Sequence, residues 1–89
     1  MKLQENKECF FCDTTENLHR HHVFGGPNRK HSEEYGMVVY LCANHHNMSA
    51  NGVHMNRKRD LLLKKYAQKV FEEEYGHDKF MEVFKRNYL

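Results

Sequence analysis

The N-terminal half of the chain carries the pattern of a β-hairpin. Residues 37–41 (Met-Val-Val-Tyr-Leu) are rich in β-branched and aromatic side chains and form the clearest strand signal. Residues 17–23 could form a second short strand. Between them, residues 24–28 (Phe-Gly-Gly-Pro-Asn) are typical of a turn and open a polar loop that extends to about Tyr35. We therefore predict two antiparallel strands joined by a long loop.

Two helices are predicted after the hairpin. The first is short: it begins with Asn44, a residue that favours the N-cap, and runs to about Asn51, before Gly52. The second spans about residues 57–75, where apolar residues recur at steps of three and four, and it ends at Gly76.

A third helix is predicted near the C-terminus, with Asp78 as its N-cap. Each of the last two helices carries one apolar stripe, and we expect both stripes to pack into the core and to take no part in chemistry. The stripe residues are Leu63, Tyr66, Ala67, Val70 and Phe71 on the longer helix, and Phe80, Val83, Phe84 and Tyr88 on the last one.

The predicted core is small. A chain of 89 residues is long enough for one domain, and its apolar fraction is 39% with a mean hydropathy of -0.92. A domain of this size buries a limited share of its surface, so we expect a metal ion or another cross-link to support the hydrophobic packing. The predicted hairpin and helices indicate a small α+β fold.

The sequence also predicts a compartment. No apolar run approaches the roughly 20 residues that a membrane span needs, and residues 1–5 lack the apolar stretch of a secretory signal. The three cysteines are an odd number and cannot all pair as disulfides, which favours a reducing compartment in which cysteines bind metal. We expect a cytoplasmic protein without a membrane partner.

Charge is unevenly distributed, although the formal net charge is only +2. Residues 36–56 contain no Lys, Arg, Asp or Glu, and a basic segment follows at once. Such a segment is either a solvated surface or a contact for the phosphates of a nucleic acid, and the sequence favours neither. The candidate nucleic-acid-binding residues are Arg57, Lys58, Arg59, Lys64 and Lys65.

Two short motifs predict a structural zinc site. Cys9 and Cys12 are separated by two residues, and so are Cys42 and His45 about 30 residues later. A tight turn lets two side chains of this spacing occupy adjacent corners of a tetrahedron, and two such halves complete the shell. The alternative is three free thiols that pack as small apolar groups.

Histidine is the other unusual feature, with eight residues in the chain. His21 and His22 follow each other between the two halves of the predicted zinc site, and His46 and His54 lie just after it. A neutral imidazole can bind a divalent metal or accept a proton near neutral pH. The alternative is a set of core histidines whose nitrogens are satisfied by hydrogen bonds.

Taken in order, these motifs resemble the HNH endonuclease superfamily in its zinc-bound, ββα-metal form. The order is Cys9/Cys12, then His21-His22-Val23, then Cys42 to His46. The resemblance covers about residues 9–55, and the whole chain is similar to small phage-encoded members, including recombination-enhancement nucleases. It implies a zinc-stapled, treble-clef-like hairpin plus helix, followed by two C-terminal helices.

The resemblance also implies roles for single residues. His22 matches the general base that takes a proton from the attacking water. His21 matches the first ligand of a catalytic divalent metal, a position at which relatives often have Asp. His46, next to the zinc ligand His45, matches the second ligand, and His54 is a third ligand or a phosphate contact.

The family pattern is incomplete in this chain. Members carry an Asn that orients the base shortly before the second-strand cysteine, whereas residues 35–41 contain none. We expect Asn28, a backbone group of the loop or another group to orient His22 instead. Adjacent strand residues face opposite sides, so His21 and His22 share one site only if the strand twists or breaks near residues 25–27.

The expected activity is metal-dependent hydrolysis of DNA by an HNH-type endonuclease. Imidazole ligands favour Mn²⁺, Co²⁺, Ni²⁺ or Zn²⁺ over Mg²⁺ at the catalytic site, although Glu33 or Glu34 could reach it from the loop. One alternative is a zinc-ribbon module that binds nucleic acid without cutting it. Another is an adaptor that docks on a partner through Phe80, Phe84 and Tyr88.

The resemblance implies a single nuclease domain over residues 1–89. Its zinc and ββα-metal core covers about residues 9–55, and a helical extension covers about residues 56–89. The expected partner is DNA, with a homodimer or a larger recombination or packaging complex as further possibilities. A phage-encoded protein of this kind would work in the host cytoplasm.

Overall fold

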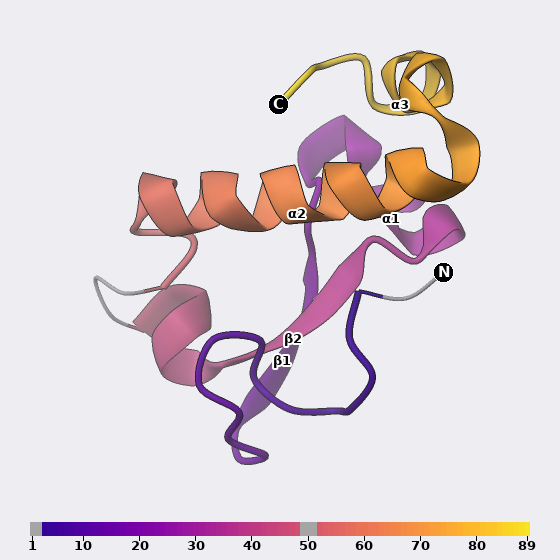
Figure 1. The fold of residues 1–89 in the computed structure, drawn as a ribbon. Helices are drawn as coiled ribbons and strands as arrows, with labels where there is room; N and C mark the ends of the chain where they lie inside the picture. Colours follow the sequence, from indigo (N-terminus) through magenta and orange to yellow (C-terminus); the bar gives the residue numbers. More distant parts are fainter. Residues whose placement is uncertain (1–2, 49–51) are drawn as a thin grey trace.

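The hairpin predicted from the sequence lies at the centre of the fold (Figure 1). The computed structural model describes residues 3–48 and 52–89. Strand β1 (Leu18–His22) pairs antiparallel with β2 (Val38–Cys42), so that Leu18 lies opposite Cys42 and His22 lies opposite Val38. The prediction of a small α+β fold with a two-stranded hairpin and helices is confirmed.

The connection between the strands is helical, so the predicted polar loop is wrong. A 3-10 turn (η1, Gly26–Asn28) leads into helix α1 (Arg29–Tyr35). Gly36 ends this helix in the left-handed region at φ 72°, which glycine adopts without strain. The buried Ser32 hydroxyl donates to the Phe24 carbonyl at 2.8 Å and accepts from the Phe24 amide at 3.1 Å, which fixes α1 against the hairpin.

The segment after β2 forms a π-helical turn, η2 (Asn44–Met48). The sequence had predicted Asn44 as the N-cap of this helix. That prediction is wrong, because Asn44 lies inside the turn. The predicted end of this helix near Asn51 lies outside the described residues. The chain is described again from Gly52, which is buried against the turn.

The two C-terminal helices are α2 (Arg57–Tyr75) and α3 (His77–Phe84). The Asn56 side chain caps α2 by accepting from the Arg59 amide at 3.1 Å. The predicted bounds of α2 are correct. Asp78 is not the N-cap of α3, because Gly76 occupies that position and Asp78 lies in the first turn.

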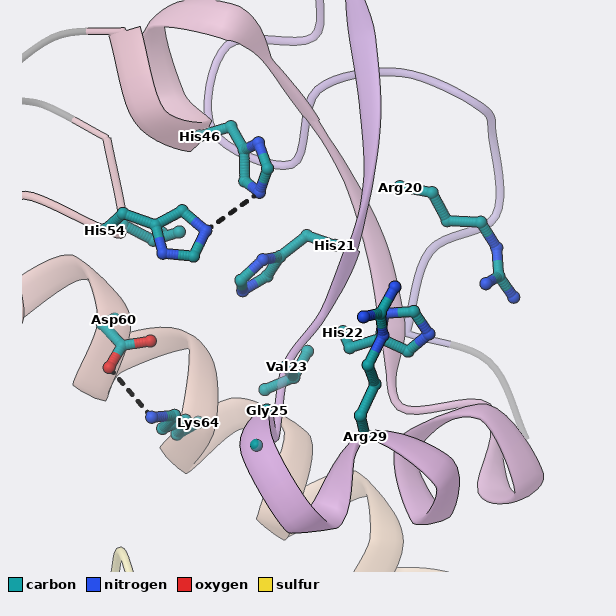
Figure 2. Close-up of a pocket in the computed structure, with 12 residues that line it drawn as sticks. Arg20, His21, His22, Val23, Gly25, Arg29, His46, His54, Asp60 and Lys64 are labelled. Atoms are coloured by element: carbon teal, nitrogen blue, oxygen red, sulfur yellow. Dashed lines mark hydrogen bonds and ion pairs between the residues drawn. The ribbon is translucent and has the colours of Figure 1, made fainter.

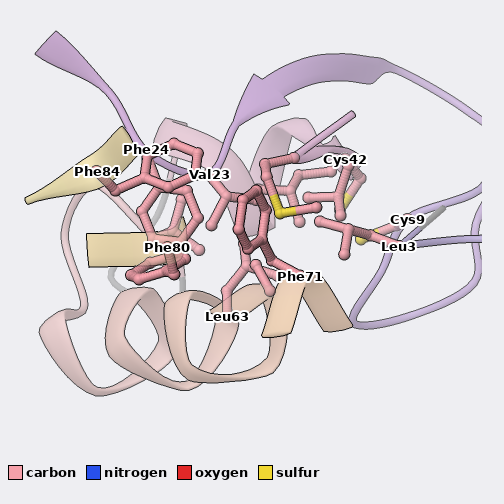
Figure 3. Close-up of a cluster of buried hydrophobic side chains, with 14 residues drawn as sticks. Leu3, Cys9, Val23, Phe24, Cys42, Leu63, Phe71, Phe80 and Phe84 are labelled. Atoms are coloured by element: carbon pink, nitrogen blue, oxygen red, sulfur yellow. The ribbon is translucent and has the colours of Figure 1, made fainter. Parts of the chain in front are cut away.

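An aromatic core fills the space between the hairpin and these helices (Figure 3). Phe24 contacts Phe84 with ring centroids 4.5 Å apart, and Phe71 contacts Phe80 at 5.5 Å. Because Phe80 and Phe84 are only 0% and 2% exposed, they are not available to dock on a partner, which removes the basis of the adaptor alternative. Of the α2 stripe, the core contains Leu63, Ala67 and Phe71, with Val70 packed at its edge. The prediction for Tyr66 is wrong, because its side chain is 37% exposed and lies outside the core.

One buried polar side chain had no signal in the sequence. Gln68 is fully buried on α2, and its amide donates to Glu72 at 2.6 Å and to Asn87 at 2.7 Å. Its carbonyl accepts from the Tyr88 amide at 2.8 Å. These bonds attach the C-terminal segment to α2. Among the described helices, none has the length and apolar character of a membrane span.

The pairing register decides which side chains of β1 face the core. Directly opposed residues of an antiparallel pair share one face of the sheet. His19 lies opposite Leu41 and His21 lies opposite Val39, so both histidines occupy the face whose apolar residues are buried. Arg20 and His22 occupy the other face.

Candidate metal centres

Four side chains come together at the end of the hairpin where β1 begins and β2 ends. The ligand atoms of Cys9, Cys12, Cys42 and His45 all lie within 4.8 Å of one another. The Cys12 and Cys42 sulfurs are 3.7 Å apart, and the Cys42 sulfur is 3.2 Å from Nδ1 of His45. Around a tetrahedral zinc ion, sulfur ligands are about 3.8 Å apart. The predicted cluster is therefore confirmed as a group that could hold a metal ion.

Local backbone structure explains how this cluster forms. The Cys9 amide donates to the Thr14 carbonyl at 2.8 Å, and the Asp13 amide donates to the Cys9 carbonyl at 2.9 Å, which closes a tight turn around the first two ligands. The Phe10 amide donates to the Tyr40 carbonyl at 2.9 Å and fastens the turn to β2. The turn thus presents its cysteines to the end of that strand.

A second cluster consists of three histidines. Ligand nitrogens of His21, His46 and His54 lie within 4.8 Å of one another, and Nε2 of His46 is 3.1 Å from Nε2 of His54. Figure 2 shows the three rings gathered on one side of β1. Imidazole nitrogens bound at about 2.0–2.1 Å to one ion are about 3 Å apart, so this spacing fits a shared metal.

His21 has the environment of an unsatisfied ligand. It is 7% exposed, and its Nε2 is a buried side-chain nitrogen without a hydrogen-bond partner in the described part of the chain. Burial is the main cause that lowers the pKa of His21 to about 3, followed by the neighbouring His46 and His54. A buried polar atom without a partner is costly, and a metal ion at this point would satisfy it.

His19 supports His46 from the same face of β1. Their Nδ1 atoms are 2.8 Å apart, which leaves Nε2 of His46 directed at His54. Burial lowers the pKa of His46, and the neighbouring His54 and His19 add to this effect. A metal-binding histidine typically has its other ring nitrogen fixed by a hydrogen bond. The sequence had predicted no role for His19.

The two clusters are joined by consecutive residues of the η2 turn. His45 belongs to the cysteine cluster and His46 to the histidine cluster. The Val53 amide donates to the His45 carbonyl at 2.9 Å, and the His54 amide donates to the His46 carbonyl at 3.2 Å. A Cβ atom on Gly52 would lie 2.8 Å from the carbonyl carbon and oxygen of His46. Glycine at this position therefore permits the approach that places His54 in the cluster.

His22 reaches the same pocket from the opposite face of β1. The strand is regular as far as His22, where it ends, and the chain enters the η1 turn at Gly26. The pocket opens around the end of the strand, and both side chains line it (Figure 2). The other residues that line it are Arg20, Val23, Gly25, Gly26, Arg29, His46, Val53, His54, Asp60 and Lys64.

The partner of His22 is Glu33 of α1. Oε2 of Glu33 is 2.7 Å from Nε2 of His22. Hydrogen bonds from Arg20, and then from His22, lower the pKa of Glu33 to about 2. Asn28 does not fill this place, because its amide donates to the Phe84 carbonyl at 3.1 Å. Glu33, which the sequence left within possible reach of the metal ligands, is not part of the histidine cluster.

The predicted nucleic-acid-binding residues are divided among different surfaces. Lys64 lines the histidine pocket and pairs with Asp60 at 3.0 Å. Lys58 and Lys65 line a separate groove on α2. The Arg59 guanidinium lies 5.2 Å from the ring centroid of Phe11, and Arg57 is exposed at the start of α2. Arg29, which the sequence did not single out, also lines the pocket and is exposed, as is Arg20, whose guanidinium pairs with Glu33.

The cysteine cluster predicts that zinc is required for folding. In Cys42→Ser we expect loss of the bound zinc and of the cooperative unfolding transition, because binding energy at such a site is folding energy in a small domain. Zinc content by mass spectrometry and thermal unfolding by circular dichroism measure both effects. Ser32→Ala, which removes a buried hydroxyl elsewhere, is the control that should keep its zinc. A metal-free Cys42→Ser protein with a wild-type transition would contradict the assignment.

Gly52 provides a test of the second cluster alone. In Gly52→Ala the added methyl group displaces the segment that carries His54, so cobalt affinity at the histidine cluster should fall by about tenfold or more. The zinc content should not change. Gly25→Ala is the matched control, because a Cβ at that position meets nothing within 4 Å. Titration with Co²⁺, followed by its visible absorption, compares the two variants. Equal cobalt affinities would show that the segment does not hold a ligand.

Comparison of the chain with models of known protein families, with curated proteins and with solved structures gives no match. The resemblance to HNH endonucleases therefore stays a prediction from the motifs. The geometry of the two clusters and of the pocket between β1, α1 and α2 is the basis for a function.

Proposed function

We propose that the protein is a metal-dependent DNA endonuclease of the HNH type. One observation carries the proposal: the three-histidine cluster and a separately oriented histidine, His22, open into the same pocket. In this interpretation the hairpin and η2 form the zinc-stapled, treble-clef-like core, and Cys9, Cys12, Cys42 and His45 hold a structural zinc ion. Four protein ligands would leave such an ion no open position, so its role would be structural.

His21, His46 and His54 are the proposed ligands of the catalytic metal. A divalent ion bound there supplies a positive charge that stabilises the negative charge developing on a scissile phosphate and on its departing oxygen. Three protein ligands leave positions for substrate and water. Because the cluster contains no carboxylate, it favours Mn²⁺, Co²⁺, Ni²⁺ or Zn²⁺ over Mg²⁺.

His22 is the proposed general base. The ionised Glu33 carboxylate can only accept a hydrogen bond, so Nε2 of His22 must carry the proton of that bond. In a neutral imidazole the lone pair then lies on Nδ1. This nitrogen is the atom that would take a proton from the attacking water, and the resemblance to the family implies a 5′-phosphate and a 3′-hydroxyl as products.

Positive charge at the pocket suits a phosphodiester substrate. Arg29 lines the pocket from α1, and Lys64 lines it from α2. Arg29 is exposed, so its guanidinium can pair with a phosphate oxygen without first leaving the core. The arrangement supports binding to the phosphate backbone without base readout, which gives affinity but little sequence preference.

A second function, nucleic-acid binding without cleavage, is favoured by the groove on α2. Lys58, Lys65 and Lys69 surround Leu62 and Tyr66, which are 55% and 37% exposed. Lysines around an aromatic ring are typical of surfaces that bind single-stranded nucleic acid. This groove would bind in the absence of any metal at the histidine cluster, so a cleavage assay separates the two functions.

The proposed function predicts that His22→Ala abolishes cleavage and preserves binding. A general base contributes about 10²- to 10⁴-fold to the rate, and it acts in the transition state more than in the ground state. We therefore expect a loss of this size in the rate of plasmid nicking with Mn²⁺. The affinity for DNA, measured by fluorescence anisotropy without added Mn²⁺, should change by less than about twofold.

His31→Ala is the matched control for this experiment. His31 lies on α1, pairs with Glu34 at 3.9 Å and does not line the histidine pocket, so this variant should cut at the wild-type rate. A His22→Ala protein that still nicks DNA would contradict the proposed function. Parallel loss of cleavage and binding would instead assign His22 to substrate contact.

A further inference from the structure

Glu33 occupies a defined position between two side chains of β1. Its Oε1 accepts from Nη2 of Arg20 at 2.6 Å, and its Oε2 accepts from Nη1 of Arg20 at 2.5 Å. The same Oε2 is 2.7 Å from Nε2 of His22. Arg20 and His22 are two residues apart on one strand and therefore share a face, so a single carboxylate can contact both.

The bidentate contact with Arg20 fixes the orientation of the carboxylate. Two parallel N–H···O bonds allow one planar arrangement of the guanidinium and the carboxylate. A carboxylate held in this way presents Oε2 to the imidazole in one direction. His22 is the least exposed of the three, with 17% of its side chain accessible, compared with 46% for Arg20 and 50% for Glu33.

We infer that Glu33 is a positioning residue for His22: with Arg20 holding its carboxylate, it keeps the proton of the imidazole on Nε2 and leaves the lone pair of Nδ1 free. The catalytic consequence rests on the proposed function, whereas the hydrogen bond itself does not. Glu33 thus fills the place that the missing Asn has in the family pattern, and it does so from α1 rather than from the second strand.

Ordinary surface ion pairing is the alternative for Glu33. Half-exposed ion pairs contribute little to stability. If Glu33 only forms such a pair, its removal should leave both kcat and the His22 resonance almost unchanged. The neighbouring Glu34 provides a reference for such a role. Its side chain is 65% exposed, and its contact with His31 on the same helix is 3.9 Å long.

The test uses the full-length, zinc-loaded protein and compares Glu33→Ala with Glu34→Ala, which makes the same change in net charge. Nicking of plasmid DNA with Mn²⁺ gives kcat and KM. Proton NMR follows the Nε2–H resonance of His22, which a bond to a carboxylate shifts downfield and protects from exchange. This resonance is assigned by its absence in His22→Ala.

In Glu33→Ala we expect kcat to fall by about tenfold or more, but by less than the roughly 10²- to 10⁴-fold that the general base itself contributes, with KM changed by less than about twofold. The downfield resonance should disappear. Glu33→Gln should recover part of both, because its amide oxygen still accepts from Nε2–H. Glu34→Ala should match the wild type in rate and spectrum.

Retention of the resonance in Glu33→Ala, or a wild-type kcat in that variant, would overturn the inference. An effect confined to KM would also overturn it, since that result assigns Glu33 to substrate binding. If the wild-type protein does not cut DNA, the proposed function fails, but the spectra still decide the role of Glu33. If the resonance is lost in Glu33→Ala but kept in Glu34→Ala, the positioning role of Glu33 is supported. If the wild-type protein shows no such resonance, the positioning role is refuted.

Discussion

The adjacency of His45 and His46 in one π-helical turn is the constraint on which the rest of the structure depends. One imidazole completes the cysteine cluster, and the next belongs to the histidine cluster. Because the carbonyls of both residues also accept hydrogen bonds from residues 53 and 54, the same turn positions His54. An ion in the cysteine cluster would therefore fix the geometry of the second cluster as well as the end of β2, in a domain whose core is too small to do so alone.

Strand β1 distributes the remaining chemistry by alternation. His19 and His21 face the clusters, while Arg20 and His22 face α1. A pocket that opens around the end of a strand can use both faces, which explains how neighbouring histidines with opposite directions can take different roles at one site. The helix between the strands is needed for this division because it carries Glu33 to the outer face.

The hairpin, the bounds of α2 and the cysteine cluster could be predicted from sequence because each depends on local spacing. Cys9 and Cys12, for example, form half of a site through a single turn. Helix α1 could not be predicted from sequence, because its polar residues follow a Gly-Gly-Pro turn and show no apolar periodicity. The contact between Glu33 and His22 depends on that helix, and the role of Gly52 depends on a close approach to His46. Tertiary contacts of this kind leave no periodic signal in a single sequence.

We propose that one turn, η2, supports two metal sites of different composition. Anomalous X-ray diffraction from zinc-loaded crystals soaked in Co²⁺, recorded at the zinc and cobalt absorption edges, tests it most directly. The account predicts a zinc peak among Cys9, Cys12, Cys42 and His45, and a cobalt peak within bonding distance of His21, His46 and His54. A zinc peak without any cobalt peak at the histidines, or cobalt bound without His21, would contradict the account.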